Sequence, residues 1–186
     1  MRTQLGRLYY VIGASGSGKD SLIDYARTHL DGERPIVFAH RYITRPAEAL
    51  GENHVALSAR EFQLRRERSL FALHWQAHGQ GYAVGIEIDR WMEQGLDVVV
   101  NGSRAYLARA RERYPRIEPL LVSVDEAVLR QRLNGRNREA EAEIERRLER
   151  AQQLPAIDMT ALSVVYNNGT LEEGGQNLLK HLLLFD

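Results

Sequence analysis

The 186-residue sequence contains no cysteine and carries a formal net charge of +0. The absence of cysteine excludes disulfide bonds and thiolate metal sites. The balanced charge argues against the basic surface with which proteins bind nucleic acids. No apolar run approaches the length of a membrane span, and the first residues show no signal-peptide pattern. We therefore expect a cytoplasmic protein without a nucleic-acid or membrane partner.

Lysine is also nearly absent from the chain. Of the 25 basic residues only Lys19 and Lys180 are lysines, and the other 23 are arginines. Because the chain has so few lysines, the position of each one is informative. The remaining composition, 44% hydrophobic and 27% charged, is ordinary for a globular protein, and the length suits one compact domain. Nothing in the composition indicates an oligomeric state.

Short β-rich runs alternate with helical patterns along most of the chain. The predicted strands cover residues 8–12, 36–38, 98–100, 120–124 and 163–166. The predicted helices cover residues 19–30, 62–68, 86–94, 105–113, 126–133, 139–153 and 171–184. This alternation predicts an α/β fold with a mainly parallel sheet flanked by helices. We expect a single domain over 1–186, a polar loop over 41–54, and inserts at about 41–83 and 134–150.

A glycine-rich segment joins the first predicted strand to the first predicted helix. It consists of Gly13, Ala14, Ser15, Gly16, Ser17, Gly18 and Lys19. Its glycines let consecutive backbone N–H groups turn inward, and with the helix N-terminus they form an anion cradle. Lys19 would add a positive charge at the β- and γ-phosphates of ATP. A ligand-free glycine turn is the alternative, but the strand–loop–helix context favours a phosphate-binding P-loop.

The residue after Lys19 departs from the P-loop pattern. A serine or threonine hydroxyl normally ligates Mg²⁺ there, but this chain has Asp20, followed by Ser21. A carboxylate is also a good Mg²⁺ ligand, so Asp20 could hold the metal. Alternatively, Asp20 only interacts favourably with the helix dipole in the first turn. The sequence leaves both interpretations open.

Arginines cluster near a predicted helix break at 134–138. They are Arg130, Arg132, Arg136, Arg138, Arg146, Arg147 and Arg150. Guanidinium groups suit the charge that develops on the γ-phosphoryl group during transfer. Glutamates at i,i+4 spacing offer the alternative of a solvated helix face, which we favour for Arg130, Arg146 and Arg150.

From Leu8 to Leu184 the chain resembles the guanylate kinase family. The shared motifs are the P-loop, Thr44-Arg45, Gly51-Glu52, Gly79-x-x-Tyr82, Arg132-Leu133-Asn134-Gly135-Arg136 and Arg147-Leu148. The resemblance implies a P-loop NTPase fold, ATP as phosphoryl donor, an acceptor-binding insert over 41–83 and a lid over 134–150. By position, Arg132, Arg136 and Arg147 match the lid arginines, and Tyr82 matches a tyrosine that binds the acceptor phosphate. Asn168, or its neighbour Asn167, lies where that family contacts adenine.

The departures from guanylate kinases concern the acceptor base. Leu73 and Asn101 stand where that family reads guanine with carboxylates. A second arginine just after Thr44-Arg45-Pro46 is missing, and Arg41 stands upstream instead. Without the two carboxylates, guanine N–H groups would be left unpaired, which strongly disfavours GMP as the acceptor.

Several segments are similar to those of a subfamily, the ribose 1,5-bisphosphate phosphokinases of phosphonate catabolism. They are Gly18-Lys19-Asp20-Ser21, Ala39 to Pro46, Glu52-Asn53-His54 and Asn101-Gly102-Ser103-Arg104. This resemblance implies an enzyme that uses ATP and Mg²⁺ and transfers a phosphoryl group from ATP to a phosphorylated sugar. It assigns acceptor phosphates to Arg41, Arg45 and Tyr82, a further phosphate to Arg104, and ribose hydroxyls to Asn101 and Ser103.

Other interpretations of the same residues stay open. A nucleoside monophosphate kinase of unusual specificity would share the P-loop and the lid. A guanylate-kinase-like binding module without catalysis would not need Lys19 or the lid arginines. Glu52 could help a Mg²⁺-bound water or pair with an arginine. His40, His54, His74 and His78 are more often structural than catalytic in such positions.

Overall fold

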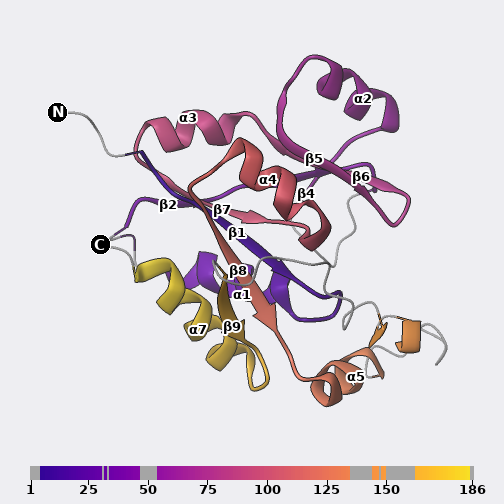
Figure 1. The fold of residues 1–186 in the computed structure, drawn as a ribbon, viewed down its shortest axis with the longest axis vertical. Coiled ribbons are helices and arrows are strands. Elements are labelled where there is room, and N and C mark those ends of the chain that lie inside the picture. The colour runs from indigo at the N-terminus through magenta and orange to yellow at the C-terminus, as the bar shows by residue number, and fades with distance from the viewer. Residues whose placement is uncertain are drawn as a thin grey trace.

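The computed structural model describes residues 5–30, 32, 34–46, 54–134, 144–146, 148–149 and 162–184 (Figure 1). Its main sheet has five strands in the order β2-β7-β1-β8-β9, and all neighbouring strands run parallel. The strands are β1 (Leu8–Gly13), β2 (Ile36–Phe38), β7 (Asp97–Asn101), β8 (Ile117–Ser123) and β9 (Ser163–Tyr166). Because β1 is central, the segment that leaves it lies at the middle of the carboxyl edge of the sheet.

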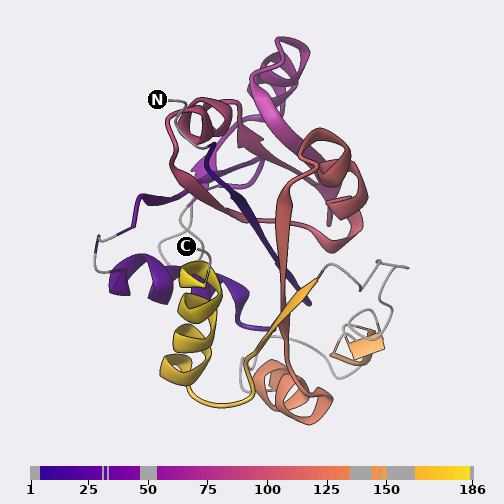
Figure 2. The same cartoon turned by 60° about the vertical axis from the view of Figure 1, so that its left-hand side comes forward.

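Alternation along β1 divides the core into two layers. Tyr9 and Val11 face α1 (Lys19–His29) and α7 (Leu171–Leu183), whereas Tyr10 and Ile12 belong to the core on the opposite face. The latter core includes residues of α3 (Glu87–Glu93) and α4 (Leu107–Arg113) and of a second sheet. Figures 1 and 2 show α1 and α7 together on one side, with α3, α4 and the second sheet on the other. The α/β prediction is confirmed.

The second sheet is formed within the segment expected to be an insert. Its order is β4-β3-β6-β5, with β3 (Arg41–Ile43), β4 (His54–Ala56), β5 (Phe71–Ala77) and β6 (Gln80–Gly85). The predicted loop over 41–54 is therefore wrong at both of its ends. β3 and β4 are only three residues long, and pairing decides their conformation, since β4 pairs with β3 and β3 also pairs with β6. β5 and β6 form a hairpin whose turn residues His78 and Gly79 have φ values of 50° and 73°.

Most predicted elements lie within a few residues of the observed ones, and two differences have clear causes. α2 (Ala59–Glu67) begins three residues before the expected start because the Ser58 side chain accepts a hydrogen bond from the N–H of Glu61. β8 begins three residues early and includes Pro119, which a strand beside two neighbours rarely tolerates. β9 pairs with β8 only from Leu120 onward, so among the described residues strand β8 has at Pro119 a neighbour on one side alone.

Only part of the expected lid is described. α5 (Glu126–Asn134) ends where the lid begins, and residues 144–146 and 148–149 are helical. Ile144 and Leu148 are buried against Leu129 and Leu133 of α5. The remaining residues of the predicted helix 139–153 lie outside the described residues. No helix in the described ranges is long and apolar enough to cross a membrane.

Candidate active site

The P-loop connects the carboxyl end of β1 to the first turn of α1. Gly16 and Gly18 have φ values of 90° and 85°, a backbone region that residues with a Cβ rarely adopt. The loop is closed by a hydrogen bond of 3.1 Å from Ser17 N to Ala14 O. Ser17 is only 1% exposed, and its Oγ has no hydrogen-bond partner in the described part of the chain. The predicted phosphate cradle therefore has the conformation that its glycines imply.

A buried asparagine that follows β9 holds the P-loop through a hydrogen bond. Asn167 is 4% exposed, and its Nδ2 donates to Ser17 O over 2.7 Å. A Cβ added to Gly18 would approach this nitrogen to 2.5 Å, so the glycine allows the close contact. The sequence did not reveal this support. Its one signal was an Asn-Asn pair directly after a strand.

We expect Asn167→Ala to lower the free energy of unfolding by about 1–3 kcal/mol, because it removes the short buried hydrogen bond to Ser17 O and leaves that oxygen only the longer contact of 3.5 Å with Arg132. Urea denaturation of the variant would measure the change. Asn177→Ala is the matched control, since the Asn177 amide bonds Tyr166 O over 3.1 Å on an exposed surface. The control should change stability by about 0.5 kcal/mol or less. Equal losses in the two variants would contradict a special role for Asn167.

Arg132, which was predicted as a lid arginine, lies beside the loop. Its guanidinium donates to Gly169 O over 3.2 Å and approaches Ser17 O at 3.5 Å. Arg130 instead pairs with Glu145 and Glu126, which confirms the expected solvated pairing for this residue. Arg136 and Arg147, the other two predicted lid arginines, lie outside the described residues.

Asp20 is the point where the loop meets the second sheet and β7. Its Oδ1 accepts a hydrogen bond of 2.6 Å from Asn101 Nδ2, and lies 3.3 Å from Lys19 Nζ and 4.0 Å from Arg41 Nη2. Burial alone would raise the pKa of Asp20, but Lys19, Arg41 and the Asn101 amide together hold it below its ordinary value. The carboxylate is therefore ionised at neutral pH, and 53% of its side chain is exposed.

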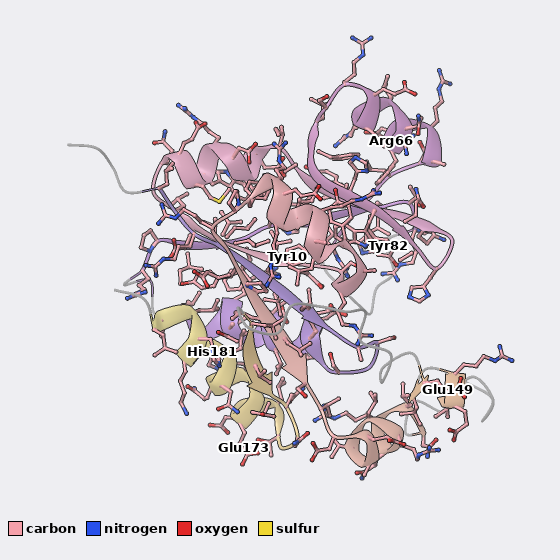
Figure 3. All side chains as sticks on the ribbon, viewed as in Figure 1. Tyr10, Arg66, Tyr82, Glu149, Glu173 and His181 are labelled. Carbon is pink, nitrogen blue, oxygen red and sulfur yellow. The ribbon has the colours of Figure 1, made fainter. Side chains whose placement is uncertain are left out.

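Arginine and aromatic side chains line the second sheet next to Asp20. The Arg41 guanidinium lies 5.2 Å above the Tyr82 ring, which stacks on Trp75 with a centroid distance of 5.8 Å. Arg45 follows β3, and its Nε is buried with no hydrogen-bond partner in the described part of the chain. Figure 3 labels Tyr82 on the second sheet and Tyr10 in the main sheet. Trp75 was not predicted as part of this site.

The chain after β7 carries the other predicted acceptor residues. Asn101 is 7% exposed, and its Oδ1 has no partner among the described residues. Ser103 is fixed through its backbone, because its N–H donates to the Tyr10 hydroxyl over 3.0 Å and its carbonyl accepts from the same group. Arg104 follows in a 3-10 turn (Arg104–Tyr106), where burial holds its pKa below the ordinary value of arginine.

The structure brings some predicted residues together and separates others. Lys19, Asp20, Arg41 and Asn101 form one contact cluster, which Tyr82 extends. Asn168, predicted near adenine, accepts a hydrogen bond of 2.8 Å from Asp125 N at the start of α5. Ser21 is exposed on α1. Leu73 is 1% exposed within the core, and its position therefore carries no carboxylate that could bind guanine.

The histidines have mainly structural or exposed positions. His54 contacts Arg45 O through Nε2 at 3.2 Å, whereas His40, His74 and His78 are exposed. Glu52 lies outside the described residues. Within the described ranges, no group of three or more His, Cys, Asp or Glu side chains could hold a metal ion. A Mg²⁺ ion in a nucleotide site needs only one or two carboxylates in addition to phosphate oxygens and waters.

Comparison with curated proteins finds close relatives over nearly the whole chain. A protein of Desulfomicrobium baculatum named ribose 1,5-bisphosphate phosphokinase PhnN is 55% identical over 174 residues, which cover 94% of this chain and 92% of that protein. A protein of the same name from Thiobacillus denitrificans is 51% identical and covers 95% of this chain and 93% of that protein. No family model matches the sequence.

Solved structures show the same architecture at low sequence identity. Guanylate kinase from Anaplasma phagocytophilum has a TM-score of 0.69 at 15% identity, covering 98% of this chain and 87% of that one. At this identity the likeness concerns the fold alone. Together with the parallel sheet and the loop after β1, it establishes the P-loop NTPase fold.

Proposed function

This chain belongs to the ribose 1,5-bisphosphate phosphokinase family, and we propose that the cluster around Lys19 and Asp20 is where it transfers phosphate. The chain is an ATP-dependent phosphotransferase. Its reaction converts ATP and ribose 1,5-bisphosphate into ADP and 5-phosphoribosyl 1-diphosphate. The observation that carries the site assignment is the contact cluster of Lys19, Asp20, Arg41 and Asn101 between the P-loop and the second sheet.

The nucleophile is an oxygen of the 1-phosphate of the sugar. It forms a bond to the γ-phosphorus of ATP while the bond from that phosphorus to the β,γ-bridging oxygen breaks and ADP leaves. Because this oxygen is already anionic, the reaction needs no general base. Catalysis then depends on positioning two polyanions in line and on neutralising their charge. A site rich in arginine and without a catalytic histidine suits that requirement.

The P-loop binds the donor in this proposal. Backbone N–H groups of residues 13–19 surround the β-phosphate, and Lys19 Nζ compensates charge on the β- and γ-phosphates. Arg132 lies beside the loop and can reach the transferred group from the lid side. Arg136 and Arg147 complete the lid by their match to the guanylate kinase motif, and Asn168 is proposed near adenine.

The second sheet and the segment after β7 bind the acceptor. Arg41, Arg45 and Tyr82 hold one phosphate, and Arg104 supplies charge for the other. The buried Arg45 Nε without a partner among the described residues is the kind of donor that an anionic ligand satisfies. Asn101 Oδ1 is similarly unpaired and can accept a hydrogen bond from a ribose hydroxyl, which Ser103 can also contact.

Mg²⁺ fits beside Asp20. The Asp20 contacts with Asn101, Lys19 and Arg41 involve Oδ1, and the carboxylate is half exposed next to the loop lysine. Asp20 would supply one oxygen ligand, and phosphate oxygens and waters would supply the rest. When bound, the ion would neutralise charge on the phosphates.

A coupled assay that compares acceptors tests the proposed function. We expect the protein with Mg²⁺ and ATP to use ribose 1,5-bisphosphate with a kcat/KM at least about 10³-fold above that for GMP or AMP, because the guanine-reading carboxylates are absent. Detection of ADP together with 5-phosphoribosyl 1-diphosphate, in equal amounts, would establish the products. A higher kcat/KM for GMP would make the chain an atypical nucleotide kinase. Absence of turnover with every acceptor would support a non-catalytic binding module.

A further inference from the structure

The residues expected to hold the metal have an unusual arrangement. In P-loop NTPases the hydroxyl after the loop lysine and an aspartate at the end of a neighbouring strand hold Mg²⁺. In this chain the residue after Lys19 is Asp20, and the residue at the end of β7 is Asn101. The family resemblance matches Asn101 to a guanine-reading carboxylate, but the structure places its side chain against Asp20, where the metal-binding aspartate of other P-loop proteins lies. β7 is the direct neighbour of β1, and Asn101 is in register with Val11, two residues before the P-loop. One carboxylate and one neutral polar group are therefore present, but at exchanged positions.

The two side chains are in direct contact. Asn101 Nδ2 donates to Asp20 Oδ1 over 2.6 Å. Because an ionised carboxylate can only accept, this bond fixes the orientation of the Asn101 amide. An aspartate at 101 would place a second carboxylate against the first in a position that is 7% exposed. Two carboxylates so close could not both stay ionised, so the neutral amide at 101 is the chemical complement of the charge at 20.

We propose that Asp20 and Asn101 are a transposed magnesium pair, in which the metal-binding carboxylate has moved from the strand end to the phosphate loop. This inference rests on the proposed function and deepens it. In its new position the carboxylate also lies 4.0 Å from Arg41 on the acceptor side. A single carboxylate thus contacts the loop lysine, the strand end and an acceptor arginine.

The transposition has a consequence for nucleotide binding. Asp20 places a negative charge beside the phosphate cradle, where it pairs with Lys19 Nζ at 3.3 Å. Without Mg²⁺ this charge repels the nucleotide phosphates, and with Mg²⁺ it attracts the metal complex. Mg²⁺ should therefore strengthen nucleotide binding markedly, and the nucleotide should strengthen Mg²⁺ binding by the same factor. If the carboxylate is moved from position 20 to position 101, nucleotide binding should still depend on Mg²⁺.

Calorimetric titration with the β,γ-imido analogue of ATP, in EDTA and in excess Mg²⁺, measures this dependence without turnover. For the wild type we expect Mg²⁺ to lower Kd by about tenfold or more. In Asp20→Asn the ratio should fall to about threefold or less, chiefly because Mg²⁺-free binding becomes tighter. In Asp20→Asn/Asn101→Asp the carboxylate and the amide are exchanged, and the ratio should return to within about threefold of the wild type.

Asp24→Asn is the matched control, because it removes an exposed carboxylate from the same helix, and its ratio should equal that of the wild type. A full Mg²⁺ dependence in Asp20→Asn, or no recovery in the exchanged double variant, would overturn the proposal. Thermal unfolding identifies any variant that does not fold, and the isosteric Asp20→Asn variant alone still tests whether Asp20 carries the dependence. These titrations contain no acceptor, so their outcome is separate from the acceptor assay.

Discussion

Lys19→Ala is expected to lower kcat by about 10²–10³-fold, since the lysine charge acts mainly on the charge that develops during phosphoryl transfer. The side chain is largely covered, at 13% exposure, and its Nζ lies 3.3 Å from Asp20 Oδ1. Its removal deletes the cation and leaves the Asp20 carboxylate facing the phosphates. We therefore also expect weaker binding of the nucleotide. Single-turnover kinetics at saturating ATP and acceptor would separate the two effects.

The chain itself provides a matched control for this variant. Lys180 is the one other lysine in the sequence, and it is exposed on α7. Lys180→Ala should retain wild-type kcat and KM. Circular dichroism and the melting temperature of both variants would establish that each is folded. Near-normal turnover by folded Lys19→Ala would remove the basis for the P-loop mechanism.

Arg45→Ala is expected to lower kcat/KM for ribose 1,5-bisphosphate by about 10²-fold while nucleotide affinity stays within about twofold of the wild type. The buried Nε has no partner in the described part of the chain, and hydrogen bonds to charged groups contribute about 1.5–3 kcal/mol each. Among the described residues the ion-pair and hydrogen-bond partners found for Asp20 are Lys19, Arg41 and Asn101, so the loss of Arg45 should not disturb the metal. The loss should appear mainly as a higher KM for the acceptor.

Arg45→Lys should recover only part of this loss, because a lysine keeps the charge but not the planar fork. Arg90→Ala is the control, since Arg90 is an exposed arginine of α3 that pairs with Glu93. Arg41→Ala should also weaken binding of the acceptor. Because Arg41 contacts Asp20, the effect of this substitution should depend on the Mg²⁺ concentration. An unchanged KM for ribose 1,5-bisphosphate in Arg45→Ala would exclude Arg45 from the acceptor site.

Local chemistry explains why much of this molecule could be read from its sequence. The phosphate loop needs glycines at fixed positions because only they adopt the positive φ that turns N–H groups inward, as Gly16 and Gly18 do. The buried parallel strands are short apolar runs, and the Thr170/Glu173 capping box marks the start of α7 within the sequence. Lys19, Asp20, Arg41 and Asn101 could each be singled out, the first two by the loop motif and the others by resemblance.

The sequence by itself thus determined the α/β class, the P-loop and most elements, because these depend on hydrophobic periodicity and on backbone conformations that few residues allow. The tertiary structure alone decided that β3 and β4 are strands, since three-residue segments gain their conformation from pairing partners far along the chain. It also decided that Asn167 supports the loop from 150 positions away, and that Asp20 meets Asn101 across 81 positions. Such contacts arise only when strands distant in sequence end at the same edge of one sheet.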